Sequence, residues 1–224
     1  MAEARSDLTS RVLPATTLCF ASSLAPRPLE LHNHHANSNP PIECFRVSGV
    51  GIIAGGAGDL GAAFSRALFE HGLQNLTILD APSEETAEPI ISRLSSDFPL
   101  AKITFTRVDV ADSGAVEKAV DAVVQTLGPI TILANFVGVV CCEHAVQHSL
   151  HSWRRAFETN NTGSFAVAQA VARTVVTTKK GGSIILVASI SGTRVNFPNH
   201  QVEYNASKAA VIMMKSYLAV GWGA

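Results

Sequence analysis

From position 50 onward, short apolar runs alternate with longer segments of helical periodicity, and this alternation restricts the fold more than any other feature. The apolar runs have strand length and occupy positions 50–54, 76–79, 103–108, 130–134 and 183–188. Strands separated by helices pair in parallel through right-handed crossovers. The sequence therefore predicts an α/β fold of the Rossmann type, a doubly wound parallel sheet in a three-layer α/β/α arrangement.

The segments with helical periodicity fill the intervals between these runs. We expect helices at 60–71, 83–97, 113–127, 149–178 and 202–220, with a break near Gly163. Asp112 precedes the third helix as an N-cap, and Gly128-Pro129 closes that helix. The last run, at 183–188, is apolar and β-branched throughout, so we expect a buried strand there.

Residues 1–44 lack this alternation and carry the polar cluster His32-Asn33-His34-His35-Ala36-Asn37-Ser38-Asn39. We expect a flexible leading segment there, with solvated histidines, and a Rossmann-fold domain over residues 45–224. The four cysteines show neither zinc-ribbon nor C-x-x-C spacing and are expected to be reduced thiols.

Composition and charge limit the partners of this domain. Hydrophobic residues make up 47% of the chain, charged residues make up 16%, and the formal net charge is -1. No cluster of Lys or Arg exceeds Lys179-Lys180, so neither nucleic acid nor a membrane is expected as a partner. The apolar runs are too short to span a bilayer, and Glu3 and Asp7 are unusual in targeting signals, so we expect a cytoplasmic location.

A glycine-rich turn, Gly55-Gly56-Ala57-Gly58-Asp59-Leu60-Gly61, connects the first predicted strand to the first predicted helix. Backbone N–H groups in such a turn can approach a pyrophosphate, and the helix presents its positive end to the charge. Asp80 closes the second strand, where a carboxylate can accept both ribose hydroxyls and repels a 2′-phosphate. These residues predict a dinucleotide site that favours NAD(H) over NADP(H).

Tyr204 and Lys208 are four residues apart on the last predicted helix and therefore share one face of it. An ammonium close to a phenol favours the phenolate, so Tyr204 can exchange a proton with an alcohol or a carbonyl. The same spacing also occurs on ordinary helix surfaces. Ser189 follows the last predicted strand, at the sheet edge where ligands bind in open α/β folds, and can donate a hydrogen bond to a substrate oxygen.

Together, the glycine turn, the stretch Ala188-Ser189-Ile190-Ser191-Gly192 and the stretch Tyr204-Asn205-Ala206-Ser207-Lys208 resemble the short-chain dehydrogenase/reductase family. The resemblance extends from about Phe45 to the last residue. It is closest to fungal polyol and sugar reductases of the mannitol dehydrogenase and sorbose reductase type. The resemblance implies an oxidoreductase that transfers hydride between a nicotinamide cofactor and an alcohol or carbonyl substrate, such as a polyol, a sugar or a small ketone.

The resemblance also assigns roles to individual residues. Ser189 polarises the substrate carbonyl, Tyr204 exchanges the proton, Lys208 holds the nicotinamide ribose, and Asn160 helps to hold a water near the lysine. An alternative interpretation of this asparagine region is a simple helix bend. The implied cofactor contacts are Gly55, Gly58, Asp59, Leu60, Gly61, Asp80, Asp109, Val110, Asn135, Gly138, Tyr204 and Lys208. NADP(H) stays the alternative cofactor because the resembled polyol reductases often use it.

The chain departs from the family pattern at two places. Asp59 replaces the middle glycine of the turn, and we expect its side chain to point outward as a helix N-cap while Gly58 supplies the close approach. Phe136 and Val137 replace small or polar residues beside the expected nicotinamide pocket.

A second constellation, Cys141-Cys142-Glu143-His144 with His148 and His151, follows the fourth strand. His144 and His148 are four residues apart, and two such side chains on a helix can bind zinc. No third ligand falls at regular spacing, and the resembled family places residues that line the substrate mouth here. We therefore expect a pocket lining and no metal.

The sequence stops after the helix that carries Tyr204, whereas the resembled family continues through a further strand and a substrate-covering segment. We expect a sheet without its last strands, an exposed fifth strand and reduced stability. An inactive nucleotide-binding relative and a non-catalytic interaction protein are the alternative functions. The helices at 149–178 and 202–220 form the oligomer core in the family, so a homodimer or homotetramer is expected.

Overall fold

In the computed structural model, which describes residues 45–179 and 181–222, five strands pair in parallel to form a sheet. They are β1 (Val50–Ala54), β2 (Asn75–Asp80), β3 (Lys102–Arg107), β4 (Ile130–Asn135) and β5 (Ser183–Leu186). The predicted leading segment 1–44, with its histidine cluster, Cys19 and Cys44, lies outside the described residues. The predicted Rossmann-type sheet is confirmed.

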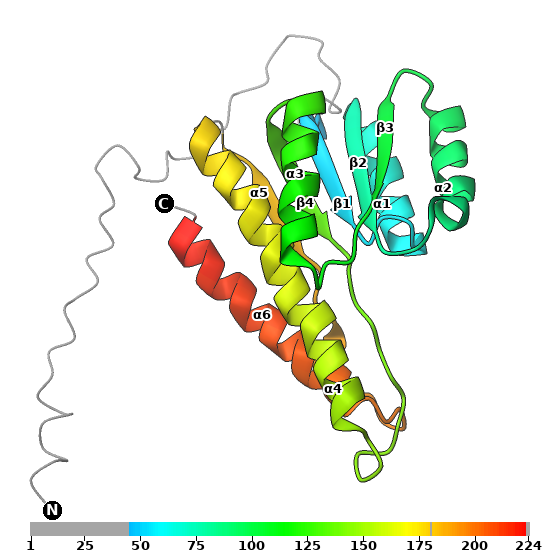
Figure 1. Cartoon of the computed structure of the whole chain (residues 1–224), viewed down its shortest axis with the longest axis vertical. Coiled ribbons are helices and arrows are strands. Elements are labelled where there is room, and N and C mark those ends of the chain that lie inside the picture. The colour runs from blue at the N-terminus through cyan, green and yellow to red at the C-terminus, as the bar shows by residue number, and fades with distance from the viewer. Residues whose placement is uncertain (1–44, 180, 223–224) are drawn as a thin grey trace, which may run out of the picture. The chain divides into compact units, whose positions relative to one another are not determined.

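The order of the strands creates the place where a ligand binds in such folds. Across the sheet the order is β3-β2-β1-β4-β5, so the chain moves outward from β1 to β3 and then returns to the other side of β1 (Figure 1). The direction of winding therefore reverses between β1 and β4. In open α/β sheets, the carboxyl ends of the strands at such a switch point flank the binding crevice.

Helices cover both faces of this sheet (Figure 1). They are α1 (Asp59–Glu70), α2 (Glu84–Asp97), α3 (Ser113–Leu127), α4 (Leu150–Phe157), α5 (Ser164–Thr178) and α6 (Val202–Trp222). Asp112 is the N-cap of α3, as predicted, and its side chain accepts a hydrogen bond of 2.9 Å from the Ala115 N–H. No helix within the described part of the chain is both long and apolar enough to cross a membrane.

The two faces of the sheet bury separate apolar clusters because successive strand residues point in opposite directions. Ile52 joins one cluster, in which α3 and α5 contribute residues such as Val120 and Val171. Ile53 joins the other cluster, which includes Leu68 of α1 and Leu94 of α2. The apolar runs of the sequence therefore read as strands that are covered on both faces.

We expected a break near Gly163 in the helical region at 149–178, but the structure shows none. A π-helical turn, η3 (Glu158–Gly163), joins α4 to α5 in one continuous path. Gly163 is required for a different reason: a Cβ atom there would lie 2.4 Å from Cγ2 of Val110. The glycine therefore permits close packing of the helix against Val110. The π-helical turn accommodates its extra residue without breaking the helix.

Of the two expectations for the fifth strand, burial is wrong and an exposed edge is confirmed. β5 ends at Leu186, two residues earlier than expected, and its residues alternate between exposed and half-buried. Among the described strands it pairs only with β4. It is therefore an edge strand, with no neighbouring strand among the described residues on its outer side. The 3-10 turn η4 (Ile190–Gly192) follows it.

Candidate active site

The glycine turn follows β1 at the switch point, and three of its four glycines are sterically required. Gly55 has φ of +71°, and a Cβ atom there would lie 2.9 Å from the backbone nitrogen of Val137. A Cβ atom at Gly61 would lie 2.5 Å from the carbonyl oxygen of Gly55. Gly58 differs, because the nearest atom to a Cβ there is 3.7 Å away. A Cβ atom at Gly56 would lie 2.9 Å from the Ile53 carbonyl oxygen, so the turn packs tightly at Gly55, Gly56 and Gly61 and has room for a side chain at Gly58.

Asp59 does not cap α1, contrary to our expectation. Gly58 occupies the N-cap position with an extended backbone, and no side chain accepts a capping hydrogen bond there. Asp59 is the first residue of the helix and is exposed, as is Leu60 after it. An acidic side chain in the first turn is favoured by the helix dipole without being a cap.

Asp80 ties the glycine turn to the end of β2. Its Oδ2 atom accepts a hydrogen bond of 2.9 Å from the Ala57 N–H, and its Oδ1 atom accepts one of 2.8 Å from the Ala81 N–H. Each carboxylate oxygen has a second lone pair. The carboxylate therefore holds the turn in place and keeps acceptor positions for the hydroxyl groups of a ligand.

Asp109 and Val110 follow β3 and face in different directions. The Asp109 side chain is exposed and accepts a hydrogen bond of 3.0 Å from the Ala111 N–H, which closes a turn before α3. Val110 is buried against Gly163 of the π-helical turn. In this structure, both residues shape the chain between β3 and the helices.

The segment after β4 carries a buried amide that lacks a partner. Asn135 accepts a hydrogen bond of 3.0 Å from the Val137 N–H through Oδ1, whereas its buried Nδ2 group has no partner among the described residues. Phe136 turns away from this edge toward α1, where its ring lies 5.3 Å from the ring of Phe64. The bulky residue therefore packs in the core, and the Asn135 amide has donor capacity left.

Lys208 lies at the centre of the site. The residue is 3% exposed, its Nζ group donates a hydrogen bond of 3.0 Å to the Val187 carbonyl, and Nζ lies 5.7 Å from the centroid of the Tyr204 ring. A Cβ atom at Gly138 would lie 3.2 Å from Nζ, and one at Gly192 would lie 2.7 Å from the Lys208 carbonyl carbon. Burial lowers the pKa of Lys208 below its usual value of 10.5.

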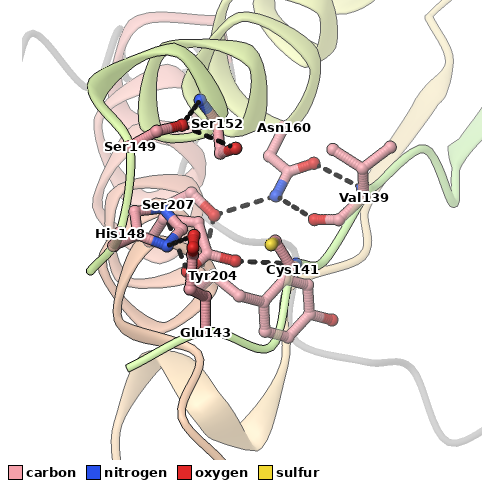
Figure 2. A network of polar contacts seen from close by, with 10 residues as sticks. Val139, Cys141, Glu143, His148, Ser149, Ser152, Asn160, Tyr204 and Ser207 are labelled. Carbon is pink, nitrogen blue, oxygen red and sulfur yellow. Dashed lines mark hydrogen bonds and ion pairs between the residues drawn. The ribbon is translucent and has the colours of Figure 1, made fainter. Parts of the chain in front are cut away.

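Asn160, in the π-helical turn, links the segment after β4 to α6 (Figure 2). Its Oδ1 atom accepts a hydrogen bond of 2.7 Å from the Val139 N–H, and its Nδ2 group donates to the Val139 carbonyl at 3.0 Å and to Ser207 Oγ at 2.9 Å. Asn161 donates a further hydrogen bond of 3.0 Å to the Ser207 carbonyl. The alternative of a mere helix bend is thus too simple, because both asparagines hold α6 beside Lys208.

Ser189 stands after β5, where the sequence placed it. Its Oγ atom accepts a hydrogen bond of 3.1 Å from the Ser191 N–H and donates one of 3.0 Å to Ser191 Oγ. Ser191 Oγ also accepts from the side-chain amides of Asn196 at 2.6 Å and of Gln201 at 3.4 Å. Sequence reasoning missed Ser191 and Ser207, although each is a polar residue inside a recognised motif.

The segment Cys141 to His148 returns to the start of α6 (Figure 2). The Cys141 N–H donates a hydrogen bond of 2.8 Å to Oε1 of the buried Glu203, and His148 Nδ1 lies 3.3 Å from Glu143 Oε2. Desolvation, followed by the charges of Glu203 and Glu143, raises the pKa of the Cys141 thiol. Glu203 is a residue that sequence reasoning also missed.

Comparison with known proteins defines the class. The family model described as short chain dehydrogenase matches residues 50–223. The chain therefore belongs to the short-chain dehydrogenase/reductase family, and the likeness predicted from its motifs is confirmed.

Two relatives and one solved structure show which members the chain is similar to. It is 32% identical over 192 residues to D-arabinitol 2-dehydrogenase (ribulose-forming) of Candida tropicalis, and the match covers 81% of this chain and 68% of the relative. It is 30% identical over 192 residues to the NADH-dependent L-xylulose reductase of Ambrosiozyma monospora, and the match covers 81% of this chain and 70% of that relative. The NADPH-dependent 3-quinuclidinone reductase of Rhodotorula rubra superposes with a TM-score of 0.73 at 28% identity, covering 85% of this chain and 72% of that one.

These relatives confirm the likeness to dehydrogenases and reductases of polyols and sugars. A particular closeness to mannitol dehydrogenase or sorbose reductase stays a prediction. The relatives include proteins named for NADH and for NADPH, so the family likeness is compatible with either cofactor.

Proposed function

We propose that this protein is an NAD(P)-dependent dehydrogenase or reductase that interconverts an alcohol and a carbonyl in a polyol, a sugar or a small ketone. The observation that carries the proposal is the buried Lys208, whose Nζ group is held by the Val187 carbonyl and lies beside the Tyr204 ring. A buried ammonium beside a phenol can stabilise the negative charge that develops on the phenol oxygen during proton transfer with an alcohol.

The residues around the glycine turn fit a dinucleotide. The tight packing at Gly55 and Gly61 keeps side chains away from the place where a pyrophosphate approaches a helix N-terminus. Asp80 keeps acceptor positions for ribose hydroxyls and favours NAD(H), because a carboxylate repels a 2′-phosphate. The unpartnered Nδ2 group of Asn135 is a further donor at this edge. A bound nicotinamide would accept or supply the hydride.

Ser189 is suited to hold the substrate oxygen. Its Oγ position is fixed by the Ser191 N–H, whereas its hydroxyl proton, which donates to Ser191 Oγ, can rotate to another acceptor. Because Ser191 Oγ already accepts from two side-chain amides, the proton of Ser189 can turn to a substrate oxygen with little loss. Tyr204 then exchanges the proton with that oxygen, and Lys208 stabilises the charge that forms.

The asparagine of the π-helical turn is proposed to act through the helix that it holds. Asn160 commits both N–H groups of its amide to Val139 and Ser207. It therefore fixes Ser207 and, with it, the neighbouring Lys208, as a positioning residue. A water near the lysine, as implied by the family resemblance, is compatible with the remaining acceptor capacity of Asn160 Oδ1.

Two measurements on the full chain test the proposal. A ligand that binds only the folded state raises the melting temperature, so NADH or NADPH should raise it. Oxidation of D-arabinitol, xylitol or D-threitol should then produce reduced cofactor, and Tyr204→Phe should abolish the signal while keeping the thermal shift. A thermal shift without turnover of any polyol, sugar or ketone would replace the proposal by the nucleotide-binding alternative.

We also propose that the long helices assemble copies of the chain. Exposed large apolar residues on α6 include Met213, Tyr217 and Val220, which are 70%, 78% and 70% exposed. Their spacing places them along one side of the helix, and an exposed apolar stripe of this kind is typical of a protein interface. A homodimer or homotetramer in the cytoplasm is the state that we expect.

A further inference from the structure

Four side chains that the proposed proton and hydride transfer does not use meet where the segment after β4 contacts the start of α6. They are Cys141, Glu143, His148 and Glu203. One potential ligand atom from each of the first three lies within 4.8 Å of those of the other two. Figure 2 shows these three side chains gathered beside Tyr204. The fold thus supplies the third ligand that regular sequence spacing did not.

The cluster contains buried polar atoms that are not satisfied by the protein. The His148 side chain is 4% exposed, and neither of its ring nitrogens has a hydrogen-bond partner among the described residues. Glu203 is fully buried, and its Oε2 atom also lacks a partner there. These atoms make no hydrogen bond of regular geometry, although His148 Nδ1 lies 3.3 Å from Glu143 Oε2 and Nε2 lies 3.8 Å from Glu203 Oε2. Buried polar groups are normally hydrogen-bonded, so this arrangement is consistent with a ligand that the three atoms surround.

The donor set is the one that zinc prefers. A thiolate, an imidazole and a carboxylate are its common protein ligands. The separation of 3.3 Å between His148 Nδ1 and Glu143 Oε2 suits two ligand atoms that each lie about 2 Å from a tetrahedral zinc ion. At the largest separation of 4.8 Å between ligand atoms, the Cys141 sulfur must move about 1 Å closer to the other two ligand atoms to bind the same zinc ion.

Glu203 has the position of a carboxylate that orients a metal ligand. With Nδ1 of His148 on the metal, the opposite ring nitrogen, Nε2, lies 3.8 Å from Glu203 Oε2. Histidine ligands of zinc usually donate their other N–H group to a carboxylate or carbonyl in this way. The other oxygen of Glu203 accepts from the Cys141 N–H, so this one side chain faces two of the three ligands.

We propose that Cys141, Glu143 and His148 bind a zinc ion, and that Glu203 orients the histidine and the cysteine. The ion would hold together the segment from Cys141 to His148, and Glu203 would link that segment to the first turn of α6, immediately before Tyr204. Three protein ligands leave one coordination position for a small molecule such as water. The competing interpretation is a metal-free cluster in which His148 is flanked by two carboxylates.

The test uses the full chain without an affinity tag, with His32, His34 and His35 replaced by alanine so that these histidines cannot bind metal. After treatment with a chelator, the protein is incubated with zinc, desalted and analysed for bound metal. Cobalt is added in a parallel sample, because tetrahedral Co²⁺ with a thiolate ligand gives visible absorption bands and a sulfur-to-metal band in the near ultraviolet. The proposal expects one ion per chain and both sets of bands.

Matched variants assign the ligands. Cys141→Ser should remove the sulfur-to-metal band, and His148→Ala should prevent zinc retention, whereas Cys142→Ser and His151→Ala should change neither. Glu203→Gln should weaken zinc binding about 10- to 100-fold. Because His148→Ala can fail to fold, circular dichroism is recorded for each variant, and the near-isosteric Cys141→Ser decides alone if His148→Ala is unfolded. Absence of stoichiometric metal, or a cobalt spectrum that Cys141→Ser leaves unchanged, overturns the proposal.

Discussion

The Nδ2 group of Asn160 donates a hydrogen bond of 2.9 Å to the Oγ atom of Ser207, the residue before Lys208. Both residues are fully buried, and they are separated by 47 positions in the sequence. Ser207 in turn donates to the Tyr204 carbonyl at 2.9 Å. The π-helical turn is therefore connected directly to the turn of α6 that carries both Tyr204 and Lys208.

Ser207→Ala should destabilise the protein by about 1–3 kcal/mol, because it leaves one buried N–H of Asn160 without an acceptor. Thermal and urea unfolding would measure the loss. Ser216→Ala is the matched control, since within the described residues Ser216 Oγ bonds only to the Ile212 carbonyl one turn earlier in the same helix. Equal stability of the two variants would contradict the role assigned to the Asn160 contact.

Tyr204→Phe should lower kcat by at least about 100-fold, the usual contribution of a proton-transferring side chain. It should keep the fold and the binding of cofactor, because the Tyr204 ring and its contact with Lys208 are retained. Steady-state kinetics and a thermal shift with NADH measure the two effects. Tyr217→Phe, at an exposed tyrosine of the same helix, should leave both unchanged. Retention of kcat by Tyr204→Phe would exclude the tyrosine as the proton donor.

Lys208→Met should reveal a pH dependence of stability. Burial lowers the pKa of Lys208 in the folded protein below the value of 10.5 expected when unfolded. Between those two values, the unfolded state binds more protons, so the free energy of unfolding rises with pH. The stability of the native protein relative to Lys208→Met should therefore increase as the pH rises through the lowered pKa toward 10.5.

Urea unfolding at a series of pH values checks this expectation. Lys215→Met serves as the control, because Lys215 is exposed on the same helix. A constant difference in the free energy of unfolding between the native protein and Lys208→Met across the alkaline range would mean that burial does not lower the pKa of Lys208.

Asp80→Asn should move the cofactor preference toward NADPH by about tenfold or more, because it removes a charge that repels a 2′-phosphate. The amide oxygen can still accept one of the two backbone hydrogen bonds that hold the glycine turn. Titrations with NADH and NADPH give the ratio of the two Kd values. Asp109→Asn, at an exposed acid after β3, should leave the ratio near that of the native protein. An unchanged ratio in Asp80→Asn would remove the basis for preferring NAD(H).

Met213→Lys combined with Tyr217→Lys should shift the protein to a smaller assembly, because two charges would be buried at the proposed α6 interface. Size-exclusion chromatography with light scattering measures the mass. Val195→Lys is the control, since that exposed residue lies in the loop before α6. If both variants have the mass of the native protein, α6 is not the interface.

The sequence was most informative where the structure is local and periodic. The alternation from Val50 onward predicted the helices and strands, and Asp112 caps its helix as its type and position indicated. Asp59 misled us because Gly58, which has no side chain to mark it as a cap, takes that position. The apolar composition of β5 suggested burial, but burial of a strand depends on its neighbours in the sheet, and β5 lies at an edge.

The contacts that were missed join residues distant in the sequence. Glu203 accepts a hydrogen bond from Cys141, 62 positions away. Local periodicity carries no information about such a pair. The cluster of Cys141, Glu143 and His148 was missed for a different reason: its members are close in the sequence, but the segment that carries them is irregular, so helical spacing rules do not apply.

The π-helical turn also sets the rotational phase of one half of the long helix relative to the other. Asn160 and Asn161 must face α6, whereas Val167 and Val171 of α5 must face the sheet. Each residue of a regular α-helix advances by about 100° around the axis, so one residue more or fewer between the two sets rotates one away from its partner. Deletion of Thr162 would therefore disrupt either the hydrogen bonds from Asn160 and Asn161 to α6 or the packing of Val167 and Val171 in the core. The extra residue of η3 lets a single helix satisfy two partners that lie in different directions.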